Sequence, residues 1–258
     1  LKELGRLREI SFRKVGEGVN KKRDTDKYDI YYRHIILWDD EELEIVGAYR
    51  IGESDFIYNN LGLEGFYSNT LFEYEQKFID TYLPNSIELG RSFVQPKYWG
   101  SRALDYLWYG IGAYLKQNPH IKTMFGPVSL SSTYPSMAKD LIVYYYAYYY
   151  KAPQTFVKAK MPYQYTHAIS NIKELYSLDN AKKDFKNLKF ALTNMQVTVP
   201  TLFKQYSELC EDKGIYFLDF NIDEQFNSCV DAFIVVDIDK IKSTQKQRYI
   251  ENKKSKKG

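Results

Sequence analysis

The chain has 258 residues, of which 44% are hydrophobic and 27% charged, a composition that suits one substantial globular core. The net charge of +3 is too small to indicate nucleic-acid binding. Two cysteines, Cys210 and Cys229, make neither a disulfide framework nor a metal pattern, and no apolar run is long enough to span a bilayer. A cytoplasmic protein is therefore expected.

Apolar residues at helical spacing predict a first helix over residues 1–15, followed by a polar loop over 16–27. Two β-like runs, 28–38 and 44–51, are split by an acidic turn and predict a hairpin. The next predicted elements are a strand over 68–74, a short helix over 75–82, a strand over 87–94, an amphipathic helix over 101–116, a strand over 122–130 and a helix over 135–150.

The periodic signals weaken after Pro153, and residues 150–195 look like an insertion or a lid. Mixed strands and helices in this order indicate an α/β or α+β domain around a single sheet. We expect one catalytic domain over residues 1–240 and a basic tail over 241–258. Such a tail is usually solvated and mobile, although it can also be attracted to anionic lipids or to an acidic carrier protein. The last predicted elements are a helix over 200–211 and strands over 214–220 and 232–238.

The best candidate for chemistry is the tetrapeptide Glu88-Leu89-Gly90-Arg91. On a strand Glu88 and Arg91 face opposite ways, but a bulge at Gly90 would aim both into one cleft. A partly buried carboxylate can act as general base toward an ammonium group, and only the neutral amine attacks a thioester carbonyl. The alternative is a structural ion pair, which the tetrapeptide alone favours.

A second candidate is the junction between this strand and the next helix, where Lys97, Gly100, Ser101 and Arg102 lie. Backbone N–H groups at the start of a helix bind anions, and the two basic side chains would add charge. The pattern indicates a phosphate site only weakly, because plain helix-starting turns are about as common.

An acidic cluster, Asp24, Asp26 and Asp29, leads into the first predicted strand. These carboxylates could hold an ammonium-bearing substrate, pair with arginines, bind a metal or lie in a solvated loop. No calcium-loop glycine accompanies them, and the three histidines assemble neither a triad nor a metal pattern. We therefore expect no metal and no permanently bound cofactor.

Taken singly, Arg8 indicates an exposed cation, Phe12 a core aromatic and Arg50 a strand-end charge. Their order along the chain resembles that of the acyl-homoserine-lactone autoinducer synthases, GNAT-like enzymes that take acyl chains from acyl carrier protein. The positions that carry this resemblance are Arg8 with Phe12, Asp26 with Asp29, Arg50, and Glu88 with Arg91.

A closer resemblance is to the ornithine-lipid and glycine-lipid N-acyltransferases and to the bacterial proteins labelled hemolysin that share their domain. It covers most of the chain and is weakest over residues 150–195. The stretches that carry it are Leu7–Arg13, Glu88–Val94, Phe125–Ser131, Lys204–Cys210 and Phe217–Phe220.

The resemblance implies a GNAT-like fold, a single central mixed sheet flanked by helices, with a C-terminal extension. It also implies transfer of a long-chain (3-hydroxy)fatty acyl group from acyl-acyl carrier protein to the amine of glycine or ornithine, giving an N-acyl amino acid or lyso-aminolipid. The implied roles are general base for Glu88, ordering of the active site and thioester for Arg91 and Arg50, and binding of substrate and N-terminal segment for Arg8, Phe12, Asp26 and Asp29.

The chain keeps only part of the usual GNAT pyrophosphate loop, in the run Tyr98–Ala103. Coenzyme A needs its pyrophosphate cradled, whereas the phosphopantetheine of a carrier protein presents a single phosphate. The partial loop, with Lys97 and Arg102 added, therefore favours a carrier-protein donor, and acyl-CoA stays open as the alternative.

Two other functions stay open. One is a signal synthase of the autoinducer type on the same fold. The other is a membrane-interacting, hemolysin-like protein, although the sequence shows neither a transmembrane stretch nor a lytic helix. For the enzyme, 25 tyrosines and the basic tail would suit peripheral contact with the anionic inner face of the membrane.

Overall fold

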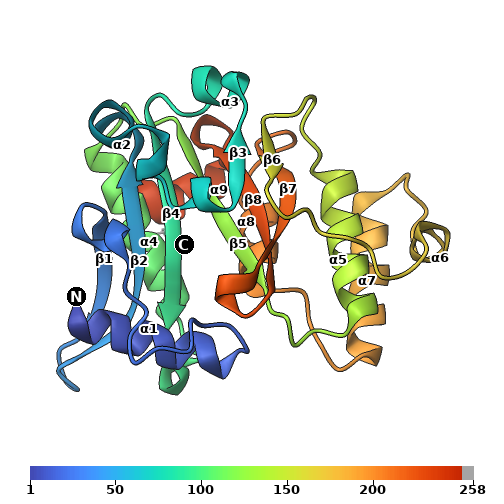
Figure 1. Cartoon of the computed structure of the whole chain (residues 1–258), viewed down its shortest axis with the longest axis horizontal. Helices are drawn as coiled ribbons and strands as arrows, with labels where there is room; N and C mark the ends of the chain where they lie inside the picture. Colours follow the sequence, from blue (N-terminus) through green and yellow to red (C-terminus); the bar gives the residue numbers. More distant parts are fainter. Residues whose placement is uncertain (252–258) are drawn as a thin grey trace, which may run out of the picture.

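One mixed sheet of six strands organises the fold, in the order β1-β2-β4-β5-β8-β7 (Figure 1). The structure is a computed structural model and describes residues 1–251. Only β4 and β5 run parallel; every other pair of neighbours is antiparallel. The expected mixed α/β architecture is thereby confirmed. The strands are β1 (Arg33–Asp39), β2 (Glu44–Glu53), β4 (Ser86–Val94), β5 (Thr123–Leu130), β7 (Ile215–Asp223) and β8 (Cys229–Asp237), and a second small sheet pairs β3 (Phe72–Tyr74) with β6 (Val157–Ala159).

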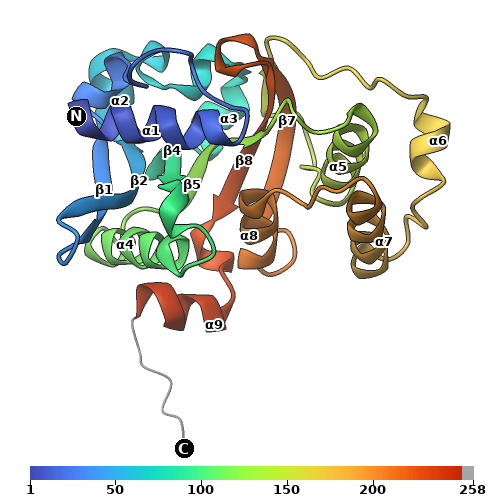
Figure 2. The ribbon, with the colours of Figure 1, turned by 90° about the horizontal axis from the view of Figure 1, so that it is seen from below.

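Helices cover both faces of the sheet (Figure 2). On one side α1 and α2 contact β4, on the other α4 contacts β1 and β2, and α5 packs beside β7 at the end of the sheet. Burial of apolar surface between these layers drives their association. The helices are α1 (Lys2–Lys14), α2 (Ser54–Leu61), α3 (Gln76–Thr81), α4 (Ala103–Gln117), α5 (Ser136–Tyr149), α6 (Ile169–Lys173), α7 (Ala181–Asn194), α8 (Thr201–Leu209) and α9 (Ser243–Gln245).

Among the described helices and strands, five were not predicted from local pattern: α2, α6, α7, α9 and β6. The long helix α7 has a polar sequence, yet Leu188 and Leu192 are fully buried on its side toward α5. Buried Asp184 accepts hydrogen bonds from Tyr149 and from the backbone of Ser177 and Leu178. Tertiary contacts thus supply what the sequence pattern lacks. The division into domains, with residues 150–195 as an insertion, stays a prediction.

The first predicted strand begins later than expected. Asp26 caps a 3-10 helix, η1 (Lys27–Ile30), by accepting hydrogen bonds from the backbone N–H groups of Tyr28 and Asp29. In turn, the backbone N–H of Asp26 donates a hydrogen bond to the Asp29 carboxylate. This reciprocal cap bends the chain away from an extended conformation before β1 starts.

The first part of the predicted basic tail is folded rather than solvated. A π-helical segment, η7 (Lys246–Ile250), lies against α4, with the rings of Trp108 and Tyr249 5.8 Å apart. Gly112 permits this approach, since a Cβ there would lie 2.0 Å from the carbonyl oxygen of Tyr249. Residues 252–258 of the tail lie outside the described part of the chain. Within residues 1–251, none of the helices has the length and apolarity needed to cross a membrane.

Candidate active site

A cleft opens where the parallel strands β4 and β5 separate. Their pairing runs only from Ser86 and Thr123 to Glu88 and Phe125. Beyond it Gly126 adopts a φ of +151°, and a Cβ there would lie 2.1 Å from the carbonyl oxygen of Leu89. A larger residue would therefore strain this crossing point, after which the two strands diverge.

A bulge in β4 turns Arg91 into the cleft. The register between β2 and β4 shifts between Ala48 and Arg50, and Arg91 takes the left-handed conformation with a φ of +48°. Such backbone strain in a residue other than glycine is frequent at functional sites. The expected bulge is present, but it lies at Arg91 rather than Gly90, and it redirects Arg91 without bringing Glu88 to the cleft.

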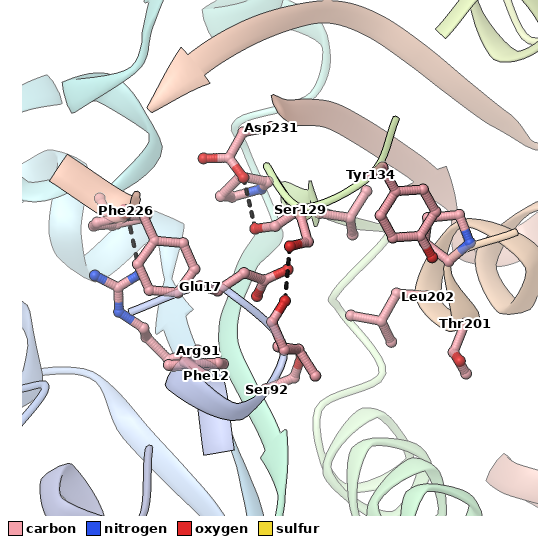
Figure 3. A pocket seen from close by; sticks show the side chains of 16 residues that line it. Phe12, Glu17, Arg91, Ser92, Ser129, Tyr134, Thr201, Leu202, Phe226 and Asp231 are labelled. Carbon is pink, nitrogen blue, oxygen red and sulfur yellow. Dashed lines mark hydrogen bonds between the residues drawn. The ribbon is translucent and has the colours of Figure 1, made fainter. Parts of the chain in front are cut away.

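Two adjoining cavities fill the cleft. The first, about 360 Å³, lies between β4 and β5 and reaches Tyr67, Arg91, Ser129 and Asp231 (Figure 3). The second, about 480 Å³, continues along β4 to the start of α4. The walls that both cavities share are Phe12, Val15, Glu17, Ser92, Thr201 and Leu202.

Glu88 is buried behind Tyr67 and lines neither cavity. The backbone N–H groups of Tyr67 and Ser68 donate to its carboxylate at 3.1 and 2.7 Å, and the Tyr32 hydroxyl donates a further bond. Burial raises the pKa of Glu88, and the hydrogen bonds from Ser68 and Tyr32 oppose that rise. Gly52, opposite Glu88 in β2, leaves space for the Tyr32 ring.

Tyr67 connects Glu88 to the cleft. While its backbone contacts Glu88, its hydroxyl accepts a hydrogen bond from Arg91 Nη1 at 3.1 Å and lies 3.4 Å from Asp223 Oδ2. The Arg91 guanidinium also stacks on the Tyr67 ring, 4.5 Å from its centre. Glu88, the base expected from the sequence, is therefore separated from the cavity by Tyr67.

Buried arginines and aspartates form a network beneath the N-terminal segment. Arg8 Nη1 lies 2.7 Å from Asp29 Oδ1, and Arg50 Nη1 lies 2.6 Å from Asp26 and 3.2 Å from Asp29. Arg91 contacts Asp24 at 3.2 Å and Asp26 at 3.8 Å. The structure thus brings together the charged residues that the sequence resemblance had linked.

This network corrects two single-residue expectations. Arg8 and Arg50, expected as an exposed cation and a strand-end charge, are both 1% exposed. Each is held by a carboxylate, because a buried charge without a partner is very costly. Asp24 and Asp29 are buried as well: Asp29 faces Arg8 and Arg50, and Asp24 faces Arg91. Phe12 is a core aromatic as expected, and its ring meets Phe226 edge-on at 5.1 Å.

The four residues expected at the donor phosphate divide into two pairs. Gly100 and Ser101 line the larger cavity at the start of α4. Lys97 instead pairs with Glu44, and Arg102 lies 3.1 Å from Asp105 and stacks on Tyr106. Both basic residues already have protein partners in this conformation.

Several cavity residues have no signal in the sequence. Glu17 lies in a loop between α1 and η1, Tyr67 precedes a 3-10 helix, and Asp231 interrupts a largely apolar strand that ends at Asp237. Ser129 falls within the stretch Phe125–Ser131, which resembled the N-acyltransferases but indicated no role for it. Only their place in the folded cleft marks these positions.

Comparison with known proteins identifies a family and several relatives. The family described as Acetyltransferase (GNAT) domain matches residues 7–109. The chain is 30% identical over 262 residues to the glycine N(alpha)-acyltransferase of Bacteroides thetaiotaomicron, across 97% of this chain and 77% of that protein. It is 30% identical over 249 residues to the L-ornithine N(alpha)-acyltransferase of Brucella abortus, across 94% and 78%. The solved acyl-homoserine-lactone synthase LasI is a weak structural match, with a TM-score of 0.32 and 18% identity over 50% of this chain and 66% of that one.

Proposed function

The chain belongs to the family of the glycine and L-ornithine N(alpha)-acyltransferases, and from that premise we propose that it moves a long-chain fatty acyl group from a phosphopantetheine thioester to the α-amine of glycine or ornithine. The observation that carries the proposal is the cleft between β4 and β5, where a charged cavity adjoins a longer one that ends at a helix start. The product would be an N-acyl amino acid, a precursor of aminolipids.

The donor would enter through the larger cavity. Backbone N–H groups at the start of α4, beside Gly100 and Ser101, suit the single phosphate of phosphopantetheine. Because β5 pairs with β4 only as far as Glu88, the following stretch of β4 can pair with the amide groups of the pantetheine arm. The thioester would then lie near Ser92, which both cavities share.

The reaction needs an amine without its proton. The ammonium group loses H⁺ to a base, and its nitrogen attacks the thioester carbonyl to form the C–N bond. The C–S bond then breaks, the base returns its proton to the leaving sulfur, and the nitrogen releases a second proton to solvent as the amide forms. We propose that Glu88, predicted from the sequence as the base, supports proton removal indirectly by fixing the Tyr67 segment that it holds, and that Arg91 and Arg50 order the cavity wall. In this proposal Arg8, Asp26 and Asp29 hold the N-terminal segment over the cleft, where Phe12 contacts the acyl chain.

An acyl carrier protein is the donor that we favour. The support is chemical: Tyr98–Ala103 retains only part of a pyrophosphate loop, and carrier proteins present one phosphate. A poorly soluble long-chain product would also suit work beside a bilayer, to which the basic C-terminal residues could be attracted.

The decisive experiment incubates the protein with palmitoyl-acyl carrier protein or palmitoyl-CoA and an equimolar mixture of amino acids, with products identified by mass spectrometry. We expect N-palmitoylglycine or N-palmitoylornithine, formed faster from the carrier-protein donor. Faster transfer from palmitoyl-CoA would overturn the donor assignment alone. Homoserine lactone products, with S-adenosylmethionine supplied, would favour a signal synthase instead. Lysis of red cells without any acyl donor would favour the hemolysin-like alternative.

A further inference from the structure

Three charged side chains from separate parts of the chain surround the smaller cavity: Arg91 of β4, Asp231 of β8 and Glu17 of the loop after α1 (Figure 3). No proposal made so far assigns a role to either carboxylate. The cavity therefore has a cation on one wall and two acids on another. That is the charge pattern of a site for a zwitterion.

Asp231 is 2% exposed but reaches the cavity. The Ser129 hydroxyl, its direct neighbour across β5 and β8, donates to Oδ1 at 2.6 Å. Within residues 1–251 Oδ2 accepts no hydrogen bond, and the side chain is in no ion pair. A buried carboxylate of this kind is stabilised only by a proton or by a cation brought in from outside.

Glu17 also lines the cavity with a carboxylate that has no partner among the described residues. Its side chain has neither a hydrogen bond nor an ion pair with any residue of the described chain. Burial, with Asp231 nearby, raises the pKa of Glu17 to about 8. Burial and the charge of Asp223 raise the pKa of Asp231 to about 7, against the hydrogen bond from Ser129 and the charge of Arg91. Two neighbouring acids that titrate near neutral pH can hold or accept one proton between them.

Arg91 supplies the opposite charge. Its Nη1 donates to the Tyr67 hydroxyl and its Nε lies 3.2 Å from Asp24, while Nη2 donates no hydrogen bond among the described residues. The side chain is 10% exposed, and the strained bulge holds it in the cavity wall. A guanidinium is always charged and binds carboxylates directionally, so it suits the carboxylate of an amino acid.

We propose that this cavity is the acceptor site and takes an α-amino acid as its zwitterion, with Arg91 at the α-carboxylate and with Asp231 and Glu17 at the α-ammonium group. This inference rests on the proposed N-acyl transfer. The proton passes from the ammonium nitrogen to the carboxylate pair, and the nitrogen lone pair attacks the thioester. The C–S bond breaks, the pair returns this proton to the leaving sulfur, and the nitrogen releases its second proton to solvent as the amide forms. Both acids thus end in their starting state.

The assignment explains why burial of Asp231 is tolerated. In the free enzyme the pair keeps a proton near neutral pH, and the incoming ammonium replaces it. The other titratable groups that face Asp231 are Asp223 and Cys229 nearby, Tyr67 across the cavity and Arg91. Burial raises the pKa of Tyr67, so its phenol stays neutral, and the carboxylates are the groups that change charge around neutral pH.

The test compares wild type with Asp231→Asn and Glu17→Gln, using the acyl donor that supports wild-type transfer, with glycine and glycinamide as acceptors. Glycinamide keeps the amine and lacks the carboxylate. We expect wild type to prefer glycine by roughly tenfold to a hundredfold in kcat/KM, the range of one charged hydrogen bond. Asp231→Asn should lower kcat/KM for both acceptors at least tenfold, leave the KM of the donor unchanged, and remove the inflection near pH 7 from the rate profile.

Glu224→Gln is the matched control, because Glu224 is an exposed acid in the turn between β7 and β8 and lines no cavity within the described residues. It should retain wild-type rates. Thermal unfolding and donor KM show whether each variant is folded. If wild type acylates no amine at all, the proposed function fails. If wild type acylates glycine and both Asp231→Asn and Glu17→Gln match it at every pH, only the acceptor-site inference fails, and equal rates with glycine and glycinamide would remove Arg91 from carboxylate binding.

Discussion

Tyr67 lies between Glu88 and the cleft. Its backbone N–H donates to Glu88 Oε2 at 3.1 Å, and its side chain lines the cavity that Glu88 does not reach. A carboxylate held by two backbone N–H groups and a tyrosine hydroxyl anchors the segment that carries Tyr67. Loss of that anchor would displace Tyr67 and so disturb Arg91, which donates a hydrogen bond to the Tyr67 hydroxyl.

Replacing Glu88 by Gln should abolish acyl transfer while the protein stays folded. An amide can accept at its oxygen, but its NH₂ group would face a backbone N–H donor, which leaves one buried partner unsatisfied at about 1–3 kcal/mol. Rates of transfer to glycine, together with thermal unfolding, test this. Wild-type rates in a folded Glu88→Gln protein would remove Glu88 from the mechanism, and Glu73→Gln, an exposed change on β3, should have no effect.

Stability should fall as the pH rises from about 4 toward 8. The folded-state pKa values of Asp231 and Glu17 are about 7 and about 8, above the ordinary carboxyl values, so the folded protein binds more protons than the unfolded chain across this window. Ionisation therefore favours unfolding there, by about 1.4 kcal/mol for each unit of pKa difference that persists. Urea unfolding at a series of pH values measures the slope.

Asp231→Asn should reduce that slope, because it removes one of the two groups that must ionise inside the fold. Its stability relative to wild type should therefore rise with pH. A slope identical to that of wild type would mean that Asp231 titrates at an ordinary value.

Removing the Arg50 guanidinium should destabilise the fold strongly. In Arg50→Met the nearest arginine to Asp26 is Arg91, at 3.8 Å, and Asp29 keeps its ion pair with Arg8. Loss of one partner from a buried ion pair costs about 3–5 kcal/mol of folding stability. Arg33→Met is the matched control, since Arg33 pairs with Glu53 at the surface and such pairs contribute about 0–1 kcal/mol. Similar midpoints of denaturant unfolding for both variants would contradict a buried network.

Shortening the chain after Glu251 should weaken binding to anionic vesicles without lowering thermal stability. The cut removes four lysines and keeps the contacts of Tyr249 with α4. Each basic residue near an anionic surface contributes on the order of 1 kcal/mol, and salt screens the effect. Cosedimentation with phosphatidylserine vesicles at low and high salt measures it. Equal binding by the full and shortened chains would show that these lysines have no part in membrane contact.

Sequence periodicity determined the elements that build the sheet and its main helical cover. The strand over 87–94 and the amphipathic helix over 101–116 appear almost unchanged as β4 and α4. Alternation of side chains on a strand and a 3.6-residue repeat on a helix are local properties, so they survive in a single sequence. The order of the charged positions, from Arg8 to Arg91, also indicated the family before any contact was known.

Tertiary structure alone decided which charges are buried and which reach the cleft. Glu88 is buried behind Tyr67 and does not line the cavity, whereas Glu17 and Asp231, far apart in the chain, both line it. No local pattern encodes these placements, because desolvation and pairing depend on partners from other strands and loops. The sequence thus determined the framework and the family, and the three-dimensional packing determined which acids can meet an amine.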